Sequence, residues 1–376
     1  MTKKRIIFPL LLLISSGFFA CMSCNKEENK TDDIVGEQKF TMDTVARNLG
    51  NPWGMAFLPN GDILFTERSG ELKRIKNSDR SIETIHGTPQ VAALGQGGLL
   101  DMALHPDYAN NGWIYLSYSK QVGSEYTTVI ARAKLSGEQL TDFQEIFIAS
   151  PSFTTTHHFG SRLALKDGYL WFSVGDRGQM DKAQELNYHN GKIMRIMDDG
   201  TIPSDNPFAG ASGALPEIWS YGHRNPQGLA FHPVTGELWA HEHGPQGGDE
   251  LNLIKKGANY GWPVITYGID YDGTIISPDT AKAGMEQPVT YWRPSIAPCG
   301  MVFCNSDQYP AWKNNIFLGG LASTALWRVE LNGNQYKNQE KLLAGIARVR
   351  NVALSPDGFL YIATESPGYI FRMVPE

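Results

Sequence analysis

The chain has 376 residues, of which 41% are hydrophobic and 19% are charged, with 39 glycines and 21 prolines. This composition is typical of a globular protein and excludes a disordered or collagen-like chain. The net charge of −6 provides no basic field, so we expect no nucleic-acid partner.

The N-terminus has the features of a bacterial lipoprotein signal. Three basic residues at 3–5 precede an apolar run at 6–14, and Cys21 and Cys24 follow. We predict a signal peptide at residues 1–24, because the run is too short to span a membrane. Cys24 is the preferred lipidated residue and Cys21 the alternative. Plain secretion with ordinary cleavage is the competing interpretation.

A polar stretch follows the signal. We expect residues 25–40 to form a flexible tether and residues 41–376 to form one catalytic domain. These boundaries predict a protein of the periplasm, cell envelope or cell surface. Its contact with the membrane would be through a lipid anchor only.

The domain repeats one pattern six times. Each copy is an apolar, alternating segment that runs into a turn and then into a second apolar segment. The aligned apolar positions are spaced 47 to 72 residues apart, at Phe57, Leu104, Leu165, Phe231, Phe303 and Leu354. Such spacing is typical of the four-stranded blades of a propeller.

The turns support strands over helices. Pro-Asn-Gly, Asp-Gly, Thr-Gly and Pro-Asp-Gly separate the paired segments and favour β-hairpins. We therefore predict an all-β fold, a six-bladed β-propeller with four-stranded antiparallel blades. A β-sandwich with coincidental turns, or a propeller of seven blades, remains the alternative.

Polar clusters beside glycine mark candidate ligand loops. The segment 95–98 places Gln96 among three glycines, where the backbone can approach a ligand. The segment 157–162 offers His158 as a general base and Arg162 as a partner for a carboxylate. If His157 and His158 lie in a strand, they point in opposite directions and cannot serve one site.

A third cluster spans residues 241–250. Its acidic side chains and glycine-bared carbonyls suit a hard cation such as Ca²⁺. His241 and His243 raise zinc as a lesser alternative, and a solvated acidic loop is the third.

Arginines and cysteines complete the candidate residues. Arg348 and Arg350 are two apart in a predicted strand and should point the same way, which with Arg224 would concentrate positive charge for an anion. Surface ion pairs are the simpler explanation. Cys299 and Cys304 should point to opposite faces, so we expect packed thiols and no bridge.

Together these segments resemble the soluble PQQ-dependent glucose/sorbosone dehydrogenase family, and within it the bacterial aldose sugar dehydrogenases. The resemblance runs from about Val45 to the C-terminus. The matching motifs stand at residues 95–101, 158–163, 174–178, 222–229, 241–250 and 259–263.

The resemblance implies a six-bladed propeller that binds pyrroloquinoline quinone (PQQ) and Ca²⁺. The carbonyls of Gly244 and Pro245 would hold the catalytic Ca²⁺, and Glu250 with Tyr260 would hold a structural one. The cofactor-binding positions it implies are Gln96, Arg224, Asn225, Tyr271, Gly320, Leu321, Ala322, Arg348, Val349 and Arg350. Ala322 departs from the family, in which related enzymes have a lysine.

The resemblance also implies a reaction. His158 would take the proton of the anomeric hydroxyl of an aldose while hydride passes to the quinone, which yields a lactone. Asp176 would contact the sugar. An external quinone or cytochrome would accept the electrons.

Two other functions fit the residues less completely. A calcium-dependent propeller hydrolase, such as a lactonase, needs calcium but no trap for a polyanion. A non-catalytic carbohydrate-binding propeller has no use for His158 beside three arginines. Adding PQQ, Ca²⁺ and aldoses to the purified protein, with a dye as acceptor, separates these alternatives.

Overall fold

A computed structural model of the chain describes residues 38–376, which form one compact unit. The predicted signal peptide at 1–24, and all but the end of the predicted tether at 25–40, lie outside the described residues. The first strand begins at Phe40, one residue before the predicted domain boundary. Across residues 38–376, no helix has the length and apolar character needed to cross a membrane.

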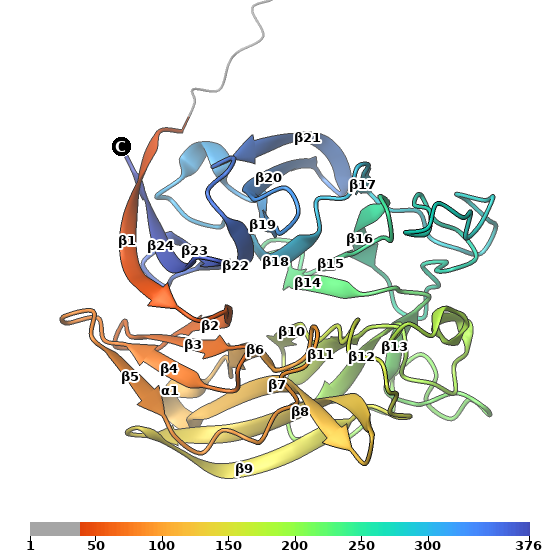
Figure 1. Cartoon of the computed structure of the whole chain (residues 1–376), viewed down its shortest axis with the longest axis horizontal. Helices are drawn as coiled ribbons and strands as arrows, with labels where there is room; N and C mark the ends of the chain where they lie inside the picture. Colours follow the sequence, from red (N-terminus) through yellow and green to blue (C-terminus); the bar gives the residue numbers. More distant parts are fainter. Residues whose placement is uncertain (1–37) are drawn as a thin grey trace, which may run out of the picture. The chain divides into compact units, whose positions relative to one another are not determined.

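Six four-stranded antiparallel sheets make up the domain, and Figure 1 shows them as blades around a common centre. The first blade contains β2 (Pro52–Phe57), β3 (Ile63–Glu67), β4 (Leu72–Ile75) and β5 (Ile82–Ile85). The second contains β6 (Leu99–Leu104), β7 (Trp113–Val122), β8 (Glu125–Ser136) and β9 (Gln139–Ile148). The third contains β10 (Leu163–Lys166), β11 (Tyr169–Val174), β12 (Lys192–Met197) and β13 (Ile218–Tyr221).

The fourth blade contains β14 (Pro226–Phe231), β15 (Leu238–Glu242), β16 (Asp249–Ile254) and β17 (Thr290–Trp292). The fifth contains β18 (Pro298–Phe303), β19 (Ile316–Gly320), β20 (Ala325–Asn332) and β21 (Gln335–Leu342). The sixth contains β22 (Arg348–Leu354), β23 (Leu360–Glu365), β24 (Gly368–Pro375) and β1 (Phe40–Leu49). The helices of the described part are short: α1 (Tyr108–Asn111) and the 3₁₀ turns Met180–Gln184 and Pro310–Trp312.

The two ends of the described chain close the ring. Strand β1 pairs antiparallel with β24, with Phe40 opposite Pro375, so the N-terminal strand completes the last blade (Figure 1). Asp43 on β1 is held by Arg80 of the first blade and by Arg372 of β24. The chain therefore passes directly from the outer strand of the sixth blade into the inner strand of the first, which ties these two blades together.

The six-blade prediction is confirmed. All six aligned apolar positions fall on the innermost strand of a blade, on β2, β6, β10, β14, β18 and β22. The turn between β10 and β11 is Asp167-Gly168, with φ of 51° and 78°, as a tight hairpin requires.

The core lies between blades. Leu64 and Leu72 of the first blade pack with Leu99 and Leu116 of the second in one buried cluster. Each buried leucine stabilises the fold by about 1.5–3 kcal/mol relative to an exposed one. Neighbouring blades therefore hold each other in place, which a single hairpin could not do.

The innermost strands are irregular where they begin. Pairing of β2, β6, β14, β18 and β22 with the next strand shifts register within the first few residues. Such bulges turn side chains away from the regular alternation. The strand starts are thus free to present polar groups at one end of the ring.

Candidate active site

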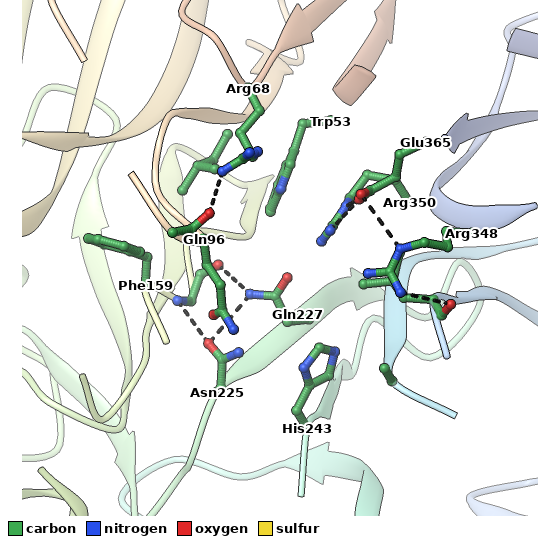
Figure 2. A pocket seen from close by; sticks show the side chains of 15 residues that line it. Trp53, Arg68, Gln96, Phe159, Asn225, Gln227, His243, Arg348, Arg350 and Glu365 are labelled. Atoms are coloured by element: carbon green, nitrogen blue, oxygen red, sulfur yellow. Dashed lines mark hydrogen bonds and ion pairs between the residues drawn. The ribbon is translucent and has the colours of Figure 1, made fainter. Parts of the chain in front are cut away.

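A cavity of about 340 Å³ opens where the innermost strands begin, and we call it the mouth cavity (Figure 2). All six blades contribute to it. Its lining residues are Trp53, Arg68, Gly95, Gln96, Leu100, Phe159, Gly160, Asn225, Gln227, His243, Ala297, Leu321, Arg348, Arg350 and Glu365. This size and mixture of aromatic and polar groups suit a small organic ligand.

His158 lies beside the mouth cavity, between the lining residues Gln96 and Phe159. Its Nδ1 is 2.7 Å from Oδ1 of Asp176, and its side chain is 12% exposed. Asp176 is 1% exposed and also accepts hydrogen bonds from the Gly178 N–H and from Nε1 of Trp262. With Nδ1 donating to the carboxylate, Nε2 carries the free lone pair that a general base needs.

The electrostatics favour the neutral imidazole. Burial lowers the pKa of His158 below 6.5, the Asp176 hydrogen bond opposes this, and Arg224 lowers it further. The pKa of Asp176 is lowered despite its burial, because His158 and Arg224 stabilise its charge. At neutral pH the pair is therefore an imidazole and a carboxylate.

The backbone at His158 is unusual and is held from two sides. Its φ is 56°, in the left-handed region, and its N–H donates to Oε1 of Gln96 at 2.9 Å. A Cβ at Gly175 would lie 2.1 Å from the His158 carbonyl oxygen, so only glycine permits this approach. The tight surroundings fix a strained residue at the edge of the cavity.

Arg68 fixes the loop that carries Gln96. It follows β3, and its Nη1 donates to the carbonyls of Gly95 and of Gly97. Gly95 has a φ of 58° and would clash with Thr156 if it carried a side chain. The predicted glycine loop is therefore a rigid element of the site.

Two arginines line the opposite wall (Figure 2). Arg348 and Arg350 both approach Glu365, and Nη1 of Arg350 donates to Sγ of Cys299 at 3.1 Å. The prediction that they share a face is confirmed, although a bulge lies between Val349 and Asn351. Three arginines and one carboxylate line the cavity, so it carries excess positive charge.

Arg224 and Asn225 immediately precede β14, the inner strand of the fourth blade. Nη1 of Arg224 donates to the carbonyls of His243 and Gly244, at 3.2 and 2.8 Å. Oδ1 of Asn225 accepts the Gly160 N–H at 3.1 Å, which fixes the segment after His158. Asn225 lines the mouth cavity, whereas Arg224 lines a smaller neighbouring one.

That smaller cavity, of about 10 Å³, has the size of a single ion or water. Glu242 and Glu250 both line it, and burial together with Glu242 raises the pKa of Glu250 to about 8. Nδ2 of Asn252 bridges the two carboxylates at 3.3 and 3.2 Å, while its Oδ1 is buried without a partner. Two buried carboxylates beside a cavity of this size fit a hard cation.

Gly244 and Tyr260 also line the small cavity. Within residues 38–376, no three His, Cys, Asp or Glu side chains gather as a metal site, so a cation here would draw on carbonyl oxygens. Nε2 of His241 and of His243 lie 3.0 and 2.8 Å from the carbonyl oxygens of Gly300 and Pro298. Because these two ring nitrogens already pair with backbone carbonyls, the arrangement does not favour the zinc alternative.

Several expectations differ from the structure. His157 and His158 lie in a loop, not a strand, and their rings touch edge to face at 4.6 Å. The guanidinium of Arg162 is buried in the ring and paired with Asp101, and it does not line the mouth cavity. Asp176, expected at the sugar, has both oxygens bonded beneath His158.

Other predicted residues lie outside the mouth cavity. Tyr271 is 71% exposed on a long loop. Val349 is fully buried in the core, and the Ala322 N–H donates to the Ile296 carbonyl. Of the segment Gly320–Ala322, Leu321 lines the cavity.

Cys299 and Cys304 are both buried and free, as predicted. Cys299 is more than a packed thiol, because its sulfur accepts hydrogen bonds from Arg162 and Arg350.

Sequence reasoning missed several lining residues, among them Trp53, Arg68, Phe159, Gln227 and Glu365. Phe159 and Gln227 lie inside the motifs at 158–163 and 222–229, and Trp53 lies shortly before the aligned position Phe57. Arg68 directly follows β3 and Glu365 is the last residue of β23, and only the register of the blades brings them to the site.

Comparison with known proteins identifies the family to which the chain is similar. Residues 49–372 match the family model described as glucose/sorbosone dehydrogenase. Aldose sugar dehydrogenase YliI of Escherichia coli is 42% identical over 344 residues, covering 89% of this chain and 92% of that protein. The crystal structure of the E. coli soluble aldose sugar dehydrogenase in its apo form superposes with a TM-score of 0.87 at 41% identity, covering 90% and 100%.

The PQQ-bound aldose sugar dehydrogenase of Streptomyces coelicolor superposes with a TM-score of 0.74 at 30% identity, covering 90% of this chain and 99% of that one. These matches extend over nearly all described residues. The chain therefore belongs to the glucose/sorbosone dehydrogenase family.

Proposed function

We propose that this protein is a PQQ-dependent aldose dehydrogenase that oxidises the sugar at its anomeric carbon. The observation that carries the proposal is the His158–Asp176 pair at the edge of a cavity lined by three arginines. The names of its relatives, which include aldose sugar dehydrogenases and a PQQ-bound structure, support it.

The mouth cavity fits a flat polyanion. Arg348 and Arg350 would hold carboxylates, while Trp53 and Phe159 offer aromatic faces. Gln96 and Asn225 would add hydrogen bonds at the rim. PQQ, when bound, would supply the acceptor for the hydride that leaves the anomeric carbon.

The protein's part in the reaction is to move a proton. The Nε2 atom of His158 would accept the proton of the anomeric hydroxyl as its C–O bond becomes a carbonyl, which forms the lactone. Asp176 would keep the proton on Nδ1 and stabilise the imidazolium that results. Gln96 would keep the ring in place through the His158 backbone.

Calcium is part of the proposal. The Gly244 and Pro245 carbonyls would hold one ion near the cofactor, and Glu250 with the backbone at Tyr260 a second. The buried Glu250 supports a cation there, because burial and the neighbouring Glu242 raise the pKa of Glu250 to about 8, and a bound cation would stabilise its ionised form.

Reconstitution tests the function. Purified protein is incubated with PQQ and Ca²⁺, and reduction of an artificial dye is followed as aldoses are added. We expect turnover with aldoses and none with alditols, which lack an anomeric hydroxyl. Saturable PQQ binding without dye reduction for any aldose would contradict the proposal.

The cellular location is a separate proposal, based on residues outside the described part. We propose that Cys24 carries a lipid anchor, which would place the enzyme at the cell envelope near an external quinone or cytochrome. Cys24→Ser should move the protein to the soluble fraction, with Cys21→Ser as its control. A free N-terminus by mass spectrometry of the membrane-extracted protein would contradict anchoring.

A further inference from the structure

The centre of the ring is crossed by one side chain, Arg162. It stands immediately before β10, and its guanidinium is 4% exposed. Burial of this charge calls for several partners. The contacts of Arg162 supply them from every other blade.

Each of the other five innermost strands touches this guanidinium. Nη1 lies 3.2 Å from Oδ1 of Asp101 on β6, and Nε donates to the Gln227 carbonyl on β14 at 2.7 Å. Nη2 donates to Sγ of Cys299 on β18 and to the Arg350 carbonyl on β22, both at 3.1 Å.

The indole of Trp53 on β2 completes the set. The guanidinium carbon lies 3.9 Å from the ring centroid, a close cation–π contact.

These contacts lie between two cavities. Trp53, Gln227 and Arg350 line the mouth cavity. Asp101 and Arg162 line a second cavity of about 270 Å³, the far cavity, which opens between the later residues of the same inner strands. The Arg162–Asp101 pair therefore stands where a continuous channel would otherwise run along the axis.

We propose that Arg162 is a positioning residue that seals the floor of the site and holds Arg350 against it. Arg162 and Arg350 donate to the same sulfur, so Cys299 links the seal to the cavity wall. Sealing excludes water that would enter from the far cavity. The seal is independent of the proposed function, whereas its effect on cofactor binding rests on it.

Cys299 is a built-in reporter of the seal. It is fully buried, as is Cys304. Cys304 lies in the hydrophobic core of the fifth and sixth blades, away from the Arg162 contacts. A reagent that enters along the axis should reach Cys299 and leave Cys304 unmodified.

The experiment labels the native full-length chain with methyl methanethiosulfonate and maps each cysteine by peptide mass spectrometry. The test variant is Arg162→Met with Asp101→Asn, which removes both charges together. The matched control is Arg195→Met, a buried arginine of the same blade that contacts Trp219 and Asn206 away from the axis. Far-UV circular dichroism and a thermal melt report folding.

We expect Cys299 in the double variant to react at least about 10-fold faster than in wild type, with Cys304 unchanged, because opening is local. Arg195→Met should leave both rates as in wild type. PQQ affinity should also fall in the double variant. If neither the wild type nor any variant binds PQQ, the proposed function is contradicted. The seal is still tested, because cysteine labelling needs no cofactor.

A folded double variant whose Cys299 stays as protected as in wild type would overturn the proposal. Equal acceleration at both cysteines would overturn it as well, since that is global unfolding. If the double variant does not fold, Arg162→Lys takes its place. An ammonium keeps the charge but cannot span five strands, so faster Cys299 labelling supports the seal and unchanged labelling refutes it.

Discussion

The two ends of the central channel are built from the same six strands, yet they differ in chemistry. At the mouth, register shifts and left-handed residues present Arg68, Gln96 and Arg350 to a cavity. At the far end, pairing is regular, and apolar side chains such as Leu229 and Leu354 surround a single buried charged pair, Asp101 and Arg162. Regular pairing builds the ring, and the irregular strand starts build the site.

Replacing the base at the mouth should have the largest effect. His158→Ala removes the Nε2 acceptor, and we expect kcat to fall by about 10²–10⁴-fold in the PQQ-loaded enzyme. Steady-state dye reduction measures this. His157→Ala is the matched control, since His157 touches the His158 ring but makes no hydrogen bond to Asp176 among the described residues. Equal losses for the two variants would place the base elsewhere.

Removing a mouth arginine should weaken cofactor binding. Arg350→Ala loses a charged hydrogen bond of about 1.5–3 kcal/mol, so we expect the Kd for PQQ to rise about 10- to 100-fold. Fluorescence titration measures the Kd. Arg132→Ala, which removes an arginine stacked on Trp113 outside the mouth, should leave it unchanged. An unchanged Kd with a raised KM for the sugar would instead assign Arg350 to the substrate.

The pH profile should reflect the burial of His158. Protonation of Nε2 removes the lone pair, and burial lowers the pKa of this histidine below 6.5. Activity should therefore hold as pH falls to 6.5 and decline only below it. The Asp176→Asn variant loses the carboxylate that raises the pKa of His158. The fall in activity at acid pH should therefore occur at a lower pH, by roughly one pH unit. A limb above pH 6.5 in wild type would contradict the neutral imidazole.

The far end should affect stability alone. Leu229→Ala removes a buried side chain from the far cavity, and we expect a loss of about 2–5 kcal/mol in the free energy of unfolding. Chemical denaturation measures this, and kcat of the folded fraction should stay unchanged. A reduced kcat would mean that the two ends are coupled through the strands.

The sequence predicted the ring because its signal is local. Each repeat couples an alternating segment to a turn such as Asp167-Gly168, and six such hairpins leave few other folds. The closing strand β1 was not predicted, because its partner β24 lies at the other end of the chain. A pairing between residues so far apart in the sequence cannot be predicted from local alternation and turn signals.

The site was predictable where motifs are dense. His158 and Gln96 were candidates from the segments 157–162 and 95–98, and Arg350 from the pair of arginines. The structure brings all three to the mouth cavity or its edge. The position of Asp176 beside His158 depends on the pairing of β10 with β11, and the burial of Arg162 depends on contacts between blades. The prediction that His157 and His158 point in opposite directions assumed a regular strand. It was wrong because the backbone at His158 is left-handed.

The mouth, and not the far end, should bind the cofactor. A crystal structure of the calcium-loaded protein soaked with PQQ would show which of the two cavities is occupied. We predict density for the cofactor in the mouth cavity, within reach of Arg348, Arg350 and Gln96 and beside Nε2 of His158. Density in the far cavity below Arg162, or none at saturating PQQ, would contradict the account.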